Sequence, residues 1–145
     1  MHTAPMSAHQ AVISADAAHA CVGAAVRAAQ SQGLSVNVAV LDASGVLAAF
    51  LRMPGAPLHS VEIAIDKAYT AVSFGLATSQ WHEALQGHSE AVREGIVRRP
   101  RFVAFGGGLA IVDQGQRIGA IGVSGASELE DEAIAQAGLA ALGLV

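Results

Sequence analysis

The chain has 145 residues, enough for one domain with its own hydrophobic core. Charged residues make up only 14% of it, against about 25% in an average globular protein, and the formal net charge is −4. This balance argues against a nucleic-acid partner or an anionic membrane surface, and no apolar run is long enough to span a membrane. So few charges predict that subunit contacts cover part of the surface, and we expect a homo-oligomer.

The first ten residues contain no lysine, no arginine and no apolar run, so they predict no secretory signal. The chain has a single cysteine, which excludes an intramolecular disulfide bond. Both features favour the cytoplasm. We expect residues 1–10 to be a flexible tail and residues 11–145 to form a single domain.

The first structured segments are a helix and a hairpin. Ser14 or Asp16 is a suitable cap for an alanine-rich helix that ends before Gly33. Alternating valines then predict a strand over residues 36–41, and a turn leads to a returning strand over residues 46–53.

The middle of the chain predicts helices. Apolar spacing indicates a helix over residues 58–74, with Ser60 as its cap, and a second helix near residues 79–86. A further helical turn is expected near residues 89–96. The basic cluster Arg98-Arg99-Pro100-Arg101 that follows is typical of a solvated turn.

Three strands and a helix complete the pattern. The strands are predicted over residues 102–105, 109–112 and 117–124. Ser127 and Glu130 fit a capping box, and the acids that follow suit the positive end of a helix dipole. The element order predicts an α/β (α+β) fold, with a five-stranded and largely antiparallel sheet flanked by helices.

Two groups of motifs carry a family resemblance. They are Arg52-Met53-Pro54-Gly55-Ala56, Ser60, Ile63-Ala64, Lys67-Ala68 and Thr70-Ala71, then Gly106-Gly107-Gly108, the run from Ile118 to Gly125, and Glu130-Asp131-Glu132. Together they resemble the GlcG/HbpS-like haem-binding family, and the module also resembles the C-terminal domain of PduO-type corrinoid adenosyltransferases. The resemblance implies a profilin-like fold, assembly into homo-oligomers that are often octamers, and haem as a ligand.

Arg52 and Lys67 are the sharpest candidates for ligand binding. Arginine offers a planar fork for a carboxylate and lysine a compact positive charge, so together they suit a haem propionate or a small carboxylic acid. The alternative is that they form structural bridges, with Glu62, with Asp66 or with the acids at 130–132.

His59 follows the loop that ends the hairpin, and Glu62 comes three residues later. His59 is suited to ligate a haem iron or to act as a general base near neutral pH. If the protein is an enzyme, we expect His59 and Glu62 to be its catalytic residues. The alternative for His59 is an ordinary solvated histidine.

Glycines in strand interiors weaken a strand, so the triplet Gly106, Gly107 and Gly108 needs a reason. Free backbone N–H groups there suit an anion, and we expect this triplet and Ser124 to line a ligand site. The spacing excludes a phosphate loop and a dinucleotide fingerprint.

These residues leave two functions open. The first is a small-molecule-binding protein that holds haem in a pocket near residues 52–67. The alternative is a small enzyme without an organic cofactor, an isomerase, lyase or hydrolase acting on a carboxylated metabolite.

Overall fold

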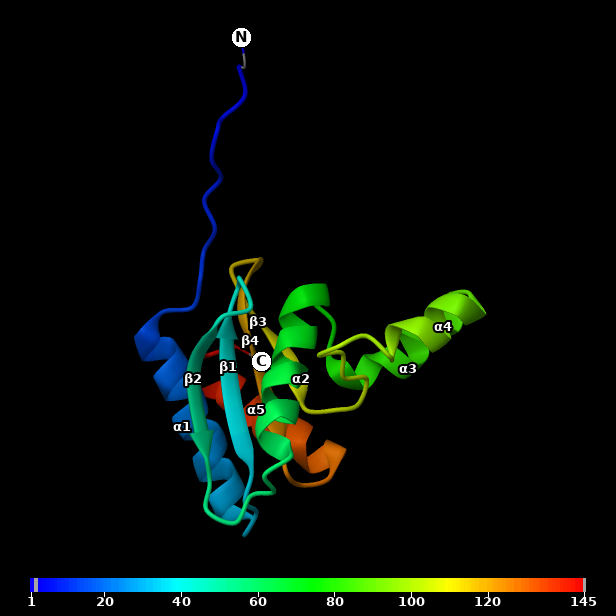
Figure 1. Cartoon of the computed structure of the whole chain (residues 1–145). Coiled ribbons are helices and arrows are strands. Elements are labelled where there is room, and N and C mark those ends of the chain that lie inside the picture. Colours follow the sequence, from blue (N-terminus) through cyan, green and yellow to red (C-terminus); the bar gives the residue numbers. More distant parts are fainter. Residues whose placement is uncertain (2, 145) are drawn as a thin grey trace.

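The computed structural model describes residues 1 and 3–144 and shows an α+β protein (Figure 1). In chain order its elements are α1 (Ala15–Ser31), β1 (Asn37–Asp42), β2 (Leu47–Arg52), α2 (Ser60–Phe74), η1 (Thr78–Gln80), α3 (Trp81–Ala84), η2 (Leu85–Gly87), α4 (Glu90–Ile96), β3 (Gly108–Asp113), β4 (Gln116–Ser124) and α5 (Glu128–Ala141). Within this described part, no helix combines the length and the hydropathy that crossing a membrane requires.

The strands form one antiparallel sheet in the order β2-β1-β4-β3. Helices α1 and α5 pack on one face of the sheet, and α2 packs on the other (Figure 1). Successive side chains of β1 point to opposite faces of the sheet and so contribute to the core on each face. Val38 and Val40 face α1 and α5, whereas Ala39 and Leu41 face α2. Burial on both faces explains why the four consecutive residues from Val38 to Leu41 are all apolar.

Capping contacts confirm two predicted helix starts. The Ser14 hydroxyl accepts the Ala17 N–H at 3.1 Å, and Gly33 follows α1 with a φ of +69°. At α5 the Ser127 hydroxyl accepts the Glu130 N–H at 3.1 Å. The Glu130 carboxylate accepts the Ser127 N–H at the same distance, which completes the capping box.

The sheet has four strands among the described residues, so the prediction of five strands is wrong. Residues 102–105 form no strand. The reason is a hydrogen bond, because the Val103 N–H donates to the Thr70 hydroxyl of α2 at 3.1 Å rather than to a neighbouring strand. The profilin-like classification stays a prediction.

Two helical boundaries also differ from expectation. Ser60 is the first residue of α2 and not its cap. The cap position is taken by His59, which has helical backbone angles and makes no side-chain capping bond. The helix predicted near residues 79–86 is divided into η1, α3 and η2.

Two segments extend away from the sheet (Figure 1). Residues 1 and 3–10 form no helix or strand and are exposed; their flexibility stays a prediction. The second segment, which we call the arm, runs over residues 75–101 and carries α3 and α4. Helix α4 has no buried residue and lies farthest from the sheet (Figure 1).

Candidate functional site

A buried ion pair joins α2 to α5 in the interior. Lys67 Nζ donates to Asp131 Oδ2 at 3.0 Å and to the Val123 carbonyl at 2.8 Å. Lys67 is 1% exposed and Asp131 is 2% exposed. The second oxygen of Asp131 accepts the Ala126 N–H at 3.0 Å. Lys67 therefore makes the structural bridge to the acids at 130–132 that the sequence left open, and its binding of a ligand stays a prediction.

The electrostatics of this pair follow from its burial. Burial lowers the pKa of Lys67 and raises the pKa of Asp131, because a low-dielectric interior disfavours either charge. The attraction between the two groups opposes both shifts. The Phe105 ring centroid, 5.0 Å from Lys67 Nζ, gives the ammonium a further favourable contact.

The glycine triplet packs closely around this ion pair. A Cβ atom on Gly107, whose φ is +128°, would lie 2.7 Å from Lys67 Nζ. A Cβ on Gly108 would lie 2.5 Å from the Lys67 carbonyl oxygen, and one on Gly106 would lie 3.0 Å from the Glu128 carbonyl oxygen. The absence of side chains therefore lets this segment approach α2 and α5. Binding of a ligand by the triplet stays a prediction.

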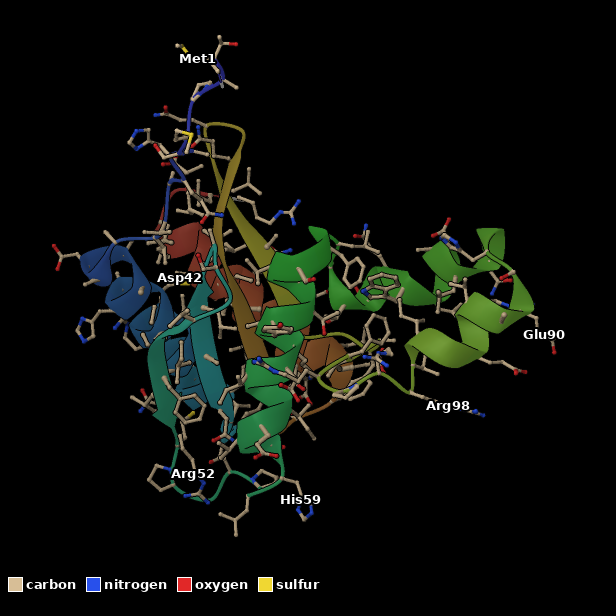
Figure 2. The ribbon with its side chains drawn as sticks, turned by 45° about the horizontal axis from the view of Figure 1, so that its top comes forward. Met1, Asp42, Arg52, His59, Glu90 and Arg98 are labelled. Atoms are coloured by element: carbon tan, nitrogen blue, oxygen red, sulfur yellow. The ribbon has the colours of Figure 1, made fainter. Side chains whose placement is uncertain are left out.

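Arg52, His59 and Glu62 lie on the surface where β2 leads into α2, whereas Ser124 is buried at the end of β4. Arg52 ends β2, is exposed, and donates from Nη2 to the Ala56 carbonyl at 2.6 Å. His59 and Glu62 are exposed just before and within the first turn of α2. Figure 2 shows Arg52 and His59 at the same lower end of the molecule. The structure thus places these three around one loop, residues 53–59, and leaves Lys67 in the interior.

Ser124 and Arg52 lie in the same cross-strand row, one on each side of Asn37. Asn37 is fully buried, and its side-chain N–H donates to the Pro57 carbonyl of the loop at 3.3 Å. Its Oδ1 has no hydrogen-bond partner among the described residues. Sequence reasoning missed Asn37, although a lone amide in an apolar strand was a visible signal.

Among the described residues, cavities open along α2 at three places. One of about 330 Å³ is lined by Glu62, Ile65, Asp66 and Arg101. One of about 230 Å³ lies between α2 and the arm, and one of about 300 Å³ lies beside the β1–β2 turn. Pockets for small molecules commonly measure about 300–1,000 Å³, so each of these three is small for a large flat ligand.

The sequence also gave no indication that Arg101 would matter. Its guanidinium carbon lies 3.5 Å from the centroid of the Tyr69 ring, and its Nε donates to Asp66 Oδ1 at 3.1 Å. Both partners lie on α2, more than 30 residues earlier in the chain. The basic cluster expected to be a solvated turn therefore contributes a side chain that is held in place.

Comparison with known proteins agrees with this architecture. The sequence matches the family described as haem degrading protein HbpS-like over residues 13–140. It is 36% identical over 126 residues to the corrinoid adenosyltransferase PduO of Salmonella typhimurium strain LT2. That alignment covers 87% of this chain but only 38% of PduO, so the chain spans well under half of that curated relative.

Two solved structures extend the comparison. The crystal structure of HbpS is 33% identical, with a TM-score of 0.86, over 99% of both chains. The structure of a PduOC:Heme complex is 37% identical, with a TM-score of 0.81, over 90% of this chain and 94% of that chain. These matches confirm the resemblance found in the sequence motifs, and the chain belongs to the HbpS-like family.

Proposed function

We propose that this protein binds haem or another tetrapyrrole. The observation that carries the proposal is the PduOC:Heme complex, a structure 37% identical to this chain over 90% of its length. The family description also names haem. The relative supports the class of ligand, and the residues of this chain indicate where the ligand binds.

The chemistry around loop 53–59 fits haem. Exposed Leu51 and Leu58, at 39% and 76%, flank Arg52 and His59 and offer apolar contact to a macrocycle. The Arg52 guanidinium suits a propionate. The exposed imidazole of His59 would be free to ligate the haem iron. Because Lys67 is buried and already paired, Arg52 is the better propionate partner.

Haem on this loop would need a second wall, since none of the three cavities along α2 has the volume to enclose it. We propose that a second copy of the chain supplies this wall in a homo-oligomer, with the octamer as the expected form. We also propose a cytoplasmic location, from the single cysteine, and a profilin-like classification of the fold.

A haem titration followed by absorbance tests the proposal. We expect wild type to give a sharp Soret band that saturates at one haem per subunit or fewer. His59→Ala should shift or remove this band. The matched control is His82→Ala, an exposed histidine on α3, which should titrate like wild type. A broad band that does not saturate, equal in all three proteins, would contradict haem binding through His59.

One cavity supports a second candidate function, a cofactor-independent enzyme acting on a carboxylated metabolite. Glu62 and Arg101 line the same 330 Å³ pocket, so a carboxylate able to move a proton faces a group able to hold an anion. His59 lies one helical turn before Glu62. This candidate predicts a colourless protein whose turnover is lost in Glu62→Gln and kept in His82→Ala.

A further inference from the structure

The cavity between α2 and the arm has features that haem binding does not explain. It measures about 230 Å³ and is lined by residues from the C-terminal half of α2, by Ile96 and by residues 99–102. The first residue of α2 that lines this cavity is Tyr69, nine residues after Ser60, so about 14 Å of helix separates the cavity from loop 53–59. We call it the arm pocket.

The wall of the arm pocket is apolar and largely aromatic. Tyr69, Phe74, Ile96 and Phe102 contribute to the lining. Phe74 and Phe102 each pack edge-on against Trp81, with ring centroids 4.8 Å apart in both pairs. A flat apolar group can therefore stack inside the pocket against rings that are already fixed by their own packing.

The rim of the arm pocket is cationic. Arg99 and Arg101 both line it, and they belong to a cluster of four arginines between positions 93 and 101 in a chain of net charge −4. Among the contacts of the described residues, the Arg101 side chain donates from Nε alone. Its two terminal NH₂ groups are therefore available to a carboxylate.

The backbone at Arg101 is unusual in a way that supports a binding role. Its φ is +68°, a left-handed conformation that a residue with a long side chain rarely adopts. Thr70 holds this turn, because its hydroxyl lies 3.0 Å from the Arg101 carbonyl oxygen and accepts the Val103 N–H. Backbone strain that surrounding contacts maintain is concentrated at ligand sites. Here those contacts hold the Arg101 guanidinium at the rim of the pocket.

We infer that the arm pocket binds a small carboxylate that carries a flat apolar group. The volume suits a ligand of about ten non-hydrogen atoms and is too small for a tetrapyrrole. The apolar group lies against Phe74 and Phe102, and the carboxylate lies between Arg99 and Arg101. This site is distinct from the loop at His59 and does not depend on haem.

The single tryptophan reports occupancy of the pocket. Trp81 contacts two of the lining rings, so a ligand that stacks on them changes its fluorescence. The experiment titrates haem-free protein with benzoate and phenylacetate, and with benzamide as the neutral control of the same shape. We expect saturable fluorescence changes below about 10 mM for the two carboxylates and none for benzamide.

Two variants and a matched control assign the effect to the rim. Arg99→Gln should weaken benzoate binding about tenfold. Arg101→Asn should do the same, and asparagine tolerates a positive φ, so the backbone is kept. The control is Arg98→Gln, an exposed neighbour that does not line the pocket and should bind as wild type does.

Three results would overturn the inference. They are no saturable change with either carboxylate, equal binding of benzamide, and equal weakening by Arg98→Gln and Arg99→Gln. Because the titration contains no haem and the haem titration varies His59, each proposal can fail while the other stands.

Discussion

Lys67 Nζ and Asp131 Oδ2 lie 3.0 Å apart in the protein interior, although 64 residues separate them in the chain. Their contact joins α2, which covers one face of the sheet, to α5, which covers the other. An ion pair in this position adds little net stability by being formed, but removing one partner leaves a buried charge without compensation.

We therefore expect Lys67→Met to lower the free energy of unfolding by about 3–5 kcal/mol, because the Asp131 carboxylate loses its counter-charge. The double variant Lys67→Met/Asp131→Leu should recover much of this loss. Urea denaturation measures both. The control is Asp66→Asn, which breaks a half-exposed bridge to Arg101 and should cost less than about 1 kcal/mol. Equal losses in Lys67→Met and Asp66→Asn would contradict the account.

Gly122 sets the distance between β4 and α2. A Cβ atom at Gly122 would clash with the Ala64 carbonyl oxygen and lie 2.6 Å from the Ala68 nitrogen, both of them helix backbone that cannot move aside locally. We expect Gly122→Ala to destabilise the protein by about 3 kcal/mol or more, measured as a lower unfolding midpoint.

Gly95→Ala is the matched control for Gly122→Ala. Gly95 lies in α4, and a Cβ atom added there meets no atom within 4 Å. Because alanine favours a helix by about 1 kcal/mol over glycine, this variant should be neutral or slightly more stable. If Gly95→Ala were as harmful as Gly122→Ala, close helix-to-strand packing would not be the cause.

Because of Cys21, we expect the stability of the protein to fall as the pH rises through the alkaline range. It is fully buried, and burial raises its pKa from 9.0 to about 12. The unfolded chain loses the thiol proton at a lower pH than the folded protein does. The contribution of Cys21 to the free energy of unfolding is therefore fully present below pH 9. It is lost as the pH rises towards 12.

The test compares wild type with Cys21→Ala by denaturation at pH 8 and at about pH 10.5. Between these values the stability advantage of wild type should shrink by about 2 kcal/mol, since one proton contributes about 1.4 kcal/mol per pH unit. All other ionisable groups are the same in both proteins, so their effects cancel in the difference. An advantage that stays constant would show that the thiol does not hold its proton in the folded state.

Local signals account for what the sequence predicted well. The caps at Ser14 and Ser127 depend on contacts between residues three positions apart, so a short stretch of sequence is enough to predict them. The fifth strand failed because the Val103 N–H bonds to Thr70, 33 residues earlier. No spacing rule reveals such a partner.

The candidate site divides in the same way. The motif residues Arg52 and Lys67 could be identified from sequence, but not that one is exposed and the other buried. The sequence offers the acids at 130–132 as one of several possible partners for Lys67, but it does not single out Asp131, because 64 residues separate the two in the chain. Arg101 lies in an exposed turn as the sequence predicts, but its contacts with Asp66 and Tyr69 could not be predicted, because both partners belong to an earlier helix.

Two serine caps should differ in their effect on global stability. Ser127 caps α5, whose Ile134, Ala135 and Leu139 are buried in the core, whereas Ser89 caps α4, which has no fully buried residue. Both hydroxyls accept a backbone N–H three residues later. We expect Ser127→Ala to lower the free energy of unfolding by about 1 kcal/mol, because the helix it frays is part of the cooperative core.

Ser89→Ala should leave the global free energy of unfolding unchanged and should instead speed amide hydrogen exchange within α4. A helix without buried contacts opens locally, at a free energy below that of global unfolding, so its cap stabilises the local structure alone. Urea denaturation and residue-resolved hydrogen exchange on both variants separate the two effects. If Ser89→Ala lowered global stability as much as Ser127→Ala, α4 would have to pack against other parts of the protein, such as a second copy covering the arm.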